Sequence, residues 1–457
     1  MAYQFPSGFL WGAATAAHQV EGNNVNSDFW VLEHRPGTPF AEPSGDAVDQ
    51  LHLYREDIAM LAAMGFEAYR FSIEWARVEP ERGVFSKAAL SHYRNVMEAC
   101  RDCEIAAVPT LHHFTSPRWL AADGGWNDMR TADRFARYAE MVAEELGDLA
   151  TLICTINEAN LPARLQLQEL MPHPRDYAHQ GWFREAARLC GATDAGRFAP
   201  FWFADGQKTI DVALAAHAKA RDAVKAAAPR VPVGVTLALY DEQVADGGEA
   251  ALAAERAACD DRFLEAVRGD DFLGVQTYTR VVYGPEGGRP PPPGAERTQM
   301  GYEYYPAALG GALRRAHAVS GCPLYVTESG IGTADDTRRM DFYAQALHSM
   351  TGCMRDGIDV RGFFAWSLLD NFEWLMGYGP TFGLVAVDRE SQSRQVKPSG
   401  RWLGRIAREN RFPAGEDPEE RVEDALAAIA DGFSNGPEPG YKAEDEGAPA
   451  PTEGDQP

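Results

Sequence analysis

The sequence lacks long apolar runs and an excess of basic residues. No stretch reaches the roughly 20 apolar residues of a transmembrane helix, and the amino-terminal segment has no Lys or Arg before its first apolar residues. Lys and Arg total 43 against 67 Asp and Glu, a formal net charge of -24. Such an acidic balance disfavours binding to phosphate backbones and anionic membranes. We therefore expect a soluble, cytoplasmic protein that binds neither nucleic acid nor membranes.

Cysteine is also scarce and shows no disulfide or zinc pattern. Seven cysteines are spread through 457 residues. The one Cys-x-x-Cys pair, Cys100 and Cys103, has no second Cys or His pair at zinc spacing. Disulfide scaffolds are short and dense in cysteine, and a structural zinc ion needs four ligands. The sequence therefore predicts free thiols, with Cys100 and Cys103 on one helix.

Eight short β-rich runs alternate with helical patterns along the chain. The runs cover residues 9–14, 69–73, 106–111, 152–157, 231–239, 272–278, 323–328 and 361–368. The helical patterns cover residues 47–64, 88–103, 132–146, 206–228, 250–267, 305–318, 337–354 and 399–411. Eight β-then-α units with nearly continuous apolar strands predict an α/β protein, a single closed (β/α)8 TIM barrel. A doubly wound sheet is the alternative, but no GxGxxG motif follows the first strand.

The predicted barrel occupies residues 1–413 and has two long βα loops. Residues 159–204 and 279–304 each follow a strand, so both loops are expected on the carboxyl face of the barrel, where loops shape a substrate site. Residues 414–457 are rich in Asp, Glu, Pro and Gly. This composition is typical of disordered segments, so we expect an acidic, mostly disordered tail.

Two glutamates end predicted strands. Glu158 ends the fourth run and Glu328 ends the seventh. Because the carboxyl ends of barrel strands meet at one face, the two side chains are expected to converge there. Paired carboxylates suit glycoside hydrolysis, in which one protonates the leaving oxygen and the other attacks the sugar or activates water. A glutamate at a strand end is also often a salt-bridge partner or a helix cap, so their placement alone leaves the role open.

Other strand ends carry hydrogen-bonding and aromatic side chains. They are Arg70, His113, Asn157, Tyr278 and Trp366. Sugars need directional polar partners for their hydroxyl groups, and their C–H faces stack on aromatic rings. This lining therefore favours a sugar site.

Five separate motifs occur in the order found in one enzyme family. They are FPSGFLWGAATAAHQVEG (5–22), YRFSIEWAR (69–77), TINE (155–158), YVTESG (325–330) and WSLLDNFEW (366–374). From residue 5 to about residue 411, the chain resembles glycoside hydrolase family 1, the β-glucosidase family. The resemblance implies a retaining, exo-acting β-glycosidase that hydrolyses terminal non-reducing β-D-glucosyl residues through a covalent glycosyl-enzyme. It implies no metal and no organic cofactor.

The resemblance also implies a role for each matching residue. Glu328 would be the nucleophile, and Glu158 the general acid and later the general base. Arg70 and Tyr278 would hold the nucleophile. The residues that would bind the non-reducing sugar are Gln19, His113, Asn157, Trp366, Glu373 and Trp374. A carboxylate at position 373 would repel a 6-phosphate, so an uncharged sugar is expected.

Several positions depart from the family pattern. The usual His-Trp-Asp-Leu-Pro reads HFTSP (113–117), the usual proline after the acid/base is Ala159, and the usual Asn-Tyr-Tyr reads QTY (276–278). These changes are expected to alter the walls of the sugar and leaving-group subsites. The loop 161–204 is expected to form an apolar aglycone wall from Trp182, Phe198, Phe201, Trp202 and Phe203. We therefore expect an aryl or other apolar β-glucoside as substrate.

Two other functions are compatible with the same sequence. A transglycosidase would use the same active site, because the covalent intermediate serves both reactions. A catalytically silent barrel would bind a glycoside without cleaving it, although the presence of both Glu158 and Glu328 argues against this alternative. The sequence leaves the oligomeric state open.

Overall fold

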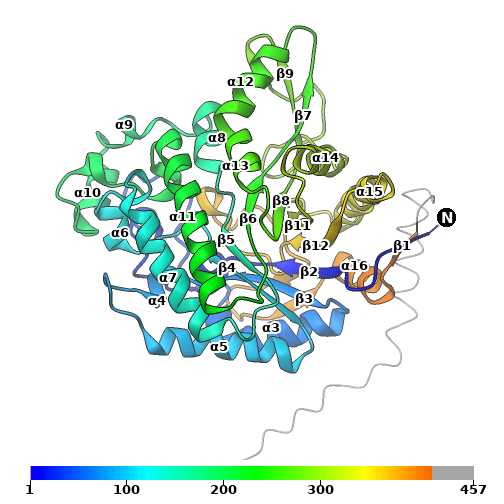
Figure 1. The fold of residues 1–457 in the computed structure, drawn as a ribbon, viewed down its shortest axis with the longest axis horizontal. Coiled ribbons are helices and arrows are strands. Elements are labelled where there is room, and N and C mark those ends of the chain that lie inside the picture. Colours follow the sequence, from blue (N-terminus) through cyan, green and yellow to red (C-terminus); the bar gives the residue numbers. More distant parts are fainter. Residues whose placement is uncertain (1, 414–457) are drawn as a thin grey trace, which may run out of the picture.

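A closed barrel of eight parallel strands forms the centre of the molecule. The computed structural model describes residues 2–413, and the tail predicted for residues 414–457 lies outside them. The barrel strands are β2 (Leu10–Ala14), β3 (Ala68–Ser72), β4 (Ala106–His112), β5 (Ile153–Ile156), β6 (Val233–Ala238), β8 (Phe272–Gln276), β11 (Leu324–Ser329) and β12 (Val360–Trp366) (Figure 1). The predicted (β/α)8 barrel is confirmed, and the doubly wound alternative is wrong.

The barrel strands are apolar because both of their faces are covered. Every residue of β3, β5, β6 and β8 is buried, as expected for parallel strands with packed side chains inside and helices outside. Where β2 and β12 pair, Gly12 lies opposite Phe364. A Cβ atom at Gly12 would lie 2.5 Å from a ring atom of Phe364, so only glycine fits there.

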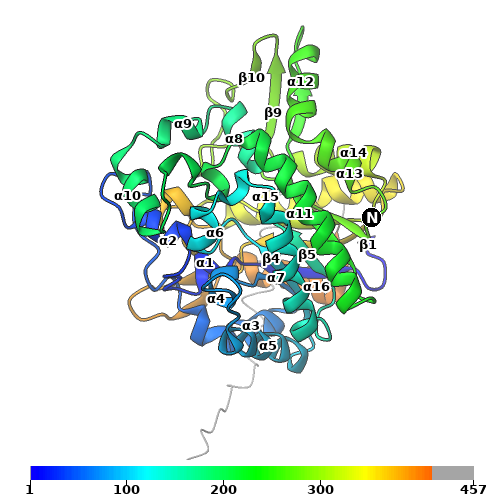
Figure 2. The same ribbon diagram turned by 60° about the vertical axis from the view of Figure 1, so that its left-hand side comes forward.

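Most of the main helices surround the barrel (Figures 1 and 2). They are α3 (Gln50–Met64), α5 (Lys87–Asp102), α7 (Arg130–Leu146), α11 (Gly206–Ala227), α12 (Glu249–Cys259), α13 (Asp261–Ala266), α14 (Ala308–Ser320), α15 (Asp336–Arg355) and α16 (Pro398–Glu409). The single helix expected at 250–267 is two helices, α12 and α13. The break falls at Asp260, whose carboxylate accepts hydrogen bonds from Asn160 (2.7 Å) and Arg164 (2.5 Å).

The long loops contain ordered elements that the sequence pattern did not reveal. The first holds α8 (Leu161–Leu167), α9 (Pro174–Tyr177) and α10 (Gly181–Leu189). Strands β7 (Asp241–Val244), β9 (Arg280–Gly284) and β10 (Gly287–Arg289) form a separate sheet in the order β10-β9-β7. Figures 1 and 2 show β9 standing beside α12, away from the barrel. These strands are short and partly exposed, so they lack the apolar alternation that marks a strand in a sequence.

Shorter elements lie between these, including four 3-10 helices, Gly125–Asn127, Ala195–Arg197, Phe201–Phe203 and Trp374–Met376. The helices α1 (Ala17–Val20), α2 (Asp28–Glu33), α4 (Trp75–Val78) and α6 (Arg118–Ala122) lie in loops. Strand β1 (Tyr3–Gln4) pairs with β15 (Arg411–Phe412), and β13 (Val385–Val387) pairs with β14 (Arg394–Val396). Across residues 2–413, no helix combines the length and apolar character needed to cross a membrane. All seven cysteines are free thiols, and six of them are buried.

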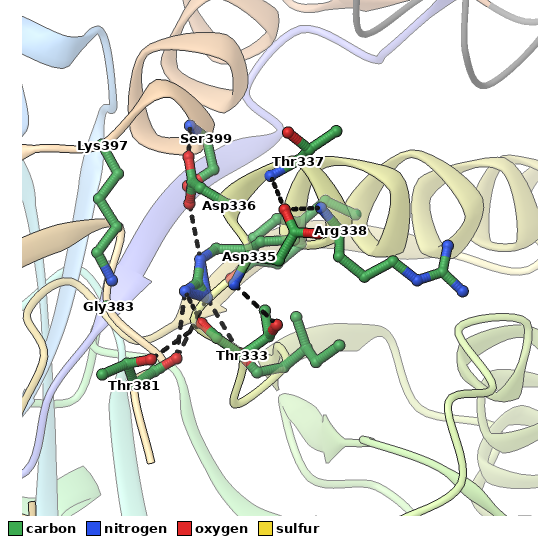
Figure 3. Close-up of polar contacts among 12 residues, drawn as sticks. Thr333, Asp335, Asp336, Thr337, Arg338, Thr381, Gly383, Lys397 and Ser399 are labelled. Atoms are coloured by element: carbon green, nitrogen blue, oxygen red, sulfur yellow. Dashed lines mark hydrogen bonds and ion pairs between the residues drawn. The ribbon is translucent and has the colours of Figure 1, made fainter. Parts of the chain in front are cut away.

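The buried side chain of Arg339 on α15 joins two loops that follow barrel strands. Its guanidinium group donates to the carbonyl oxygens of Thr333 (2.6 Å) and Thr381 (3.2 Å) and pairs with Asp336 (3.0 Å). Asp336 in turn accepts hydrogen bonds from the backbone N–H and the hydroxyl of Ser399, both at 2.7 Å. Figure 3 shows these groups converging between α15 and the start of α16. The cluster therefore fixes the loop after β11 against the loop after β12.

We predict that Arg339→Met lowers the free energy of unfolding by about 3 kcal/mol or more, because it leaves buried carbonyl groups and Asp336 without their cationic partner. The control is Arg338→Met on the same helix. The Arg338 side chain is 32% exposed and pairs with Glu296 and Asp341, so its loss should cost less than about 1 kcal/mol. Chemical denaturation of both variants measures the difference, and equal losses would contradict the assignment.

Candidate active site

A pocket of about 330 Å³ opens at the carboxyl ends of the barrel strands. Its wall includes seven of the ten predicted site residues: His113, Glu158, Tyr278, Glu328, Trp366, Glu373 and Trp374. The other three, Arg70, Gln19 and Asn157, are fully buried next to this wall rather than part of it. The seven wall residues come from the carboxyl ends of five strands, β4, β5, β8, β11 and β12, as the barrel predicts.

Three donors hold the carboxylate of Glu328 at the end of β11. Its Oε1 accepts hydrogen bonds from Nη1 of Arg70 (2.7 Å) and Nε2 of Gln276 (2.9 Å). Its Oε2 accepts a hydrogen bond from the hydroxyl of Tyr278 (2.6 Å). Burial raises the pKa of Glu328, whereas Arg70 and Tyr278 oppose that rise. The arrangement therefore favours an ionised carboxylate in a buried position.

Glu158 lies in a contrasting environment. Its backbone N–H donates to Oγ1 of Thr236 (3.1 Å), which anchors the residue to β6. Its carboxyl group has no hydrogen-bond partner among residues 2–413, and its residue surface is only 9% exposed. Burial, and secondly the negative charge of Glu328, raise the pKa of Glu158 well above the usual value. Burial thus raises the pKa of both carboxyl groups, but only Glu328 has a cation and hydrogen-bond donors beside it that oppose the rise.

Glu373 is the third carboxyl group of the pocket. Burial, followed by the charge of Glu328, raises the pKa of Glu373 to about 8. Nε2 of Gln19 lies 3.5 Å from Glu373 and makes shorter hydrogen bonds to Asn371 (3.0 Å) and to the carbonyl of Phe372 (2.7 Å). At neutral pH, Glu373 is therefore largely protonated, able to donate and to accept a hydrogen bond.

Asn157 connects the polar residues of the pocket. Its Oδ1 accepts hydrogen bonds from Arg70 and from Nε2 of Gln276 (2.8 Å). Its Nδ2 lies 3.1 Å from Nε2 of His113. Burial, and then the charge of Arg70, lower the pKa of His113 well below its usual value, so the imidazole is neutral. Asn157 thereby orients both the cation and the imidazole.

Aromatic rings form one side of the pocket. The His113 ring lies nearly parallel to Trp366 (centroids 5.7 Å apart, 23°) and to Trp374 (6.0 Å, 16°). Trp374 also contacts Phe114 (5.1 Å) and Trp202 (5.4 Å). The rings therefore present flat apolar faces to a ligand.

Backbone strain also concentrates at this pocket. Phe114, Glu158 and Trp374 have left-handed φ angles of 69°, 44° and 49°. Such angles are uncommon for residues other than glycine, and they occur preferentially at functional sites. All three residues line the pocket wall.

The predicted aglycone wall needs correction. Of the five aromatic residues expected there, only Trp202 lines the pocket. The other four, Trp182, Phe198, Phe201 and Phe203, are buried in the core, where several of them pack on one another. The apolar part of the wall is instead mainly aliphatic and consists of Leu161, Leu165, Leu170, Leu239, Met300, Leu375 and Met376.

Gln276 was not predicted as a site residue, yet it contacts Glu328 directly. One signal was present in the sequence, because glutamine stands here in place of the usual asparagine. The longer side chain places Nε2 within hydrogen-bond distance of both Asn157 and Glu328. Its Oε1 is buried without a partner among residues 2–413, as are Oε1 of Gln19 and Nδ1 of His113. These atoms add unused hydrogen-bonding capacity around the pocket.

Within residues 2–413, no group of three or more His, Cys, Asp or Glu side chains is arranged to hold a metal ion.

The mouth of this (β/α)8 barrel holds two buried carboxyl groups in different surroundings, and such a pair suits glycoside hydrolysis. The sequence model of glycosyl hydrolase family 1 matches residues 1–264 and 274–412. The chain therefore belongs to glycosyl hydrolase family 1, as the motifs predicted, and is a glycoside hydrolase.

Similar proteins agree with this membership. The chain is 32% identical to a β-glucosidase from Agrobacterium sp. (strain ATCC 21400), over 91% of this chain and 97% of that protein. It is 31% identical to a bifunctional β-D-glucosidase/β-D-fucosidase from Bifidobacterium breve, over 88% of this chain and 98% of that protein. Among solved structures, the β-glycosidase BGL167 matches with a TM-score of 0.86 at 53% identity, over 90% of this chain and 99% of that one. The family 1 β-glucosidase from Thermotoga maritima matches with a TM-score of 0.78 at 26% identity, over 91% of this chain and 100% of that one.

We predict that Gln276→Leu lowers kcat/KM for an aryl β-glycoside by about 10- to 100-fold, the range expected when a hydrogen bond to a charged group is lost. Loss of this donor should also raise the pKa of Glu328, so the acidic limb of the kcat/KM profile moves to higher pH.

The matched control is Thr277→Val, because Oγ1 of the buried Thr277 has no partner among residues 2–413. This nearly isosteric change should lower kcat/KM by less than about threefold. Equal effects of the two substitutions, or an acidic limb that stays in place in Gln276→Leu, would refute the contact between Gln276 and Glu328.

Proposed function

We propose that the protein is a retaining, exo-acting β-glucosidase that hydrolyses terminal non-reducing β-D-glucosyl residues. The main support is a contrast between two carboxyl groups. Glu328 accepts three hydrogen bonds, whereas the carboxyl group of Glu158 accepts none within residues 2–413. Membership of glycosyl hydrolase family 1 and the names of the relatives support both the retaining mechanism and the glucoside.

In the first step, the carboxylate of Glu328 attacks the anomeric carbon. The bond between that carbon and the glycosidic oxygen breaks, and Glu158 gives its proton to the departing oxygen. Arg70 and Tyr278 keep Glu328 ionised and aimed before the attack, while the raised pKa of Glu158 keeps a proton available. The products of this step are the free aglycone and a glucosyl ester on Glu328.

In the second step, Glu158 acts as a base. Its carboxylate takes a proton from water as the water oxygen attacks the anomeric carbon, and the ester bond to Glu328 breaks. As Glu328 becomes neutral in the ester, it no longer raises the pKa of Glu158, which favours the ionised form of Glu158 needed for this step. Glucose leaves with the β configuration, and both carboxyl groups return to their starting states.

The non-reducing sugar is held by Gln19, His113, Asn157, Trp366, Glu373 and Trp374 in this proposal. Unpartnered atoms of Gln19 and His113 supply hydrogen-bonding capacity for hydroxyl groups, and Trp366 supplies a stacking face. The pocket wall contains three carboxyl groups and, within the described residues, no Lys or Arg. Because no cationic side chain lines the wall to pair with a phosphate, the lining favours an uncharged glucosyl group over a phosphorylated one.

We also propose that the preferred leaving group is aryl or otherwise apolar. The aliphatic wall supports this preference, and two of its residues, Leu170 (59% exposed) and Met376 (41% exposed), are large apolar side chains left open at the mouth. Exposed apolar clusters commonly mark binding sites.

The seven free thiols support a reducing, cytoplasmic setting.

The test is release of 4-nitrophenol from its β-D-glucoside by the wild type, Glu328→Ala and Glu158→Ala, with and without azide. We expect wild-type turnover and almost none from Glu328→Ala, with azide producing the α-glucosyl azide. For Glu158→Ala we expect a loss of about 10²- to 10⁴-fold, with azide producing the β-glucosyl azide. Rescue shows that each variant is folded. Rescue products with the opposite configurations, or no wild-type turnover, would refute the proposal.

A further inference from the structure

A second pocket of about 720 Å³ adjoins the active-site pocket. It lies between the end of α8, strands β9 and β10, and prolines 290–292 of the run 290–293. Figure 2 shows α8, β9 and β10 on the same side of the molecule. Leu170, Tyr240 and Tyr302 line both pockets, so the two volumes meet at these three residues. We call this second volume the distal pocket and the three shared residues the junction.

The junction offers hydrogen bonds, and one of its two phenol rings packs against a buried cation. The guanidinium carbon of the buried Arg164 lies 4.6 Å from the ring centroid of Tyr240, and Arg164 is itself paired with Asp260 at 2.5 Å. The hydroxyl groups of Tyr240 and Tyr302 have no hydrogen-bond partner among residues 2–413. Two phenols thus remain available to a ligand that passes from one pocket into the other.

The walls of the distal pocket are apolar in part and acidic in balance. Leu167 (46% exposed) and Leu170 lie on one side, with the prolines 290–292 also in the lining. The charged lining residues are four carboxylates and two guanidinium groups: Glu169, Glu255, Glu286, Glu303, Arg280 and Arg289. Arg280 is neutralised by two hydrogen bonds to Glu303 (3.0 and 2.7 Å). An anionic ligand would therefore be repelled, whereas an uncharged ring fits the apolar surface.

Size supports a ligand that occupies both pockets. Small-molecule sites usually enclose about 300–1,000 Å³. The active-site pocket is at the low end of that range, and with the distal pocket it reaches the upper end.

We propose that the aglycone site has two parts and selects β-glucosides with a two-ring aglycone. The ring next to the glycosidic oxygen lies in the aliphatic mouth. A second ring, uncharged and bearing hydroxyl groups, lies in the distal pocket and hydrogen-bonds to Tyr240 and Tyr302. This inference rests on the proposed β-glucosidase activity and adds the class of its substrate. The second ring is a phenol or a sugar, since both share this chemistry.

The first experiment compares phenyl, biphenyl-4-yl and 4′-hydroxybiphenyl-4-yl β-D-glucosides, whose leaving groups have similar acidity. The measured quantity is the ratio of kcat/KM for each two-ring substrate to that for the phenyl glucoside. In the wild type, the ratio for the hydroxylated substrate should be about tenfold or more, because a second ring is removed from water. A ratio near one would overturn the inference, whereas a phenyl glucoside that is not hydrolysed would overturn the proposed activity itself.

Val282→Trp fills the distal pocket and should lower that ratio by at least tenfold, since Val282 lines the distal pocket but not the active-site pocket. Val244→Trp is the matched control, because Val244 is 42% exposed on β7 of the same sheet and lines neither pocket. It should leave the ratio unchanged. Turnover of the phenyl glucoside by each variant reports on its folding. Equal ratios in the two variants would overturn the inference.

Tyr302→Phe removes one hydroxyl group at the junction. It should lower the advantage of the hydroxylated over the plain biphenyl glucoside by about two- to tenfold, the worth of one hydrogen bond. Equal losses for both substrates would overturn the predicted contact.

Comparing cellotriose with cellobiose in Val282→Trp and Val244→Trp shows whether the second ring is a sugar or a phenol. If Val282→Trp, but not Val244→Trp, reduces the preference for cellotriose, the second ring is a sugar. If Val282→Trp lowers the biphenyl ratio and leaves the preference for cellotriose unchanged, the second ring is a phenol.

Discussion

The burial of an ionised carboxylate at the mouth of the barrel is the constraint on which this site depends. A charged Glu328 beneath apolar and aromatic walls is stable only if donors replace the water that it loses. Arg70, Tyr278 and Gln276 supply them at 2.6–2.9 Å. Asn157 in turn accepts hydrogen bonds from Arg70 and Gln276, so the donors are themselves held in place. Removal of any one of them disturbs the others.

The same negative charge gives the neighbouring carboxyl groups their properties. Glu158 and Glu373 are buried near Glu328, and its charge adds to burial in raising the pKa of both. Burial and this one charge together therefore shift both groups toward the protonated form. Three identical side chains thus differ in charge and in hydrogen bonding because their surroundings differ. The barrel makes this possible by bringing residues 158 and 328 to one face.

The sequence predicted the parts of the molecule that depend on regular patterns. All eight barrel strands were predicted, as were Glu158 and Glu328 at their carboxyl ends. A strand buried on both faces appears in the sequence as an apolar run, and few folds are compatible with a β-then-α alternation. Irregular features escaped prediction. Strands β7, β9 and β10 are too short and exposed to leave a pattern, and Phe201 packs in the core although its loop was expected to face substrate. The contact of Gln276 with Glu328 depends on side-chain length and exact placement across two strands, which no periodicity encodes.

The coupling of the two carboxyl groups is measured by ¹³C NMR titration of carboxyl-labelled glutamate, which gives the pKa of Glu158 in the wild type and in Glu328→Gln. Burial remains in the variant, but the negative charge at position 328 is lost. We expect the pKa of Glu158 to fall in Glu328→Gln, and to fall further than in Glu373→Gln, because Glu328 raises it more than Glu373 does. An unchanged pKa of Glu158 in Glu328→Gln would contradict the electrostatic coupling of the two carboxyl groups.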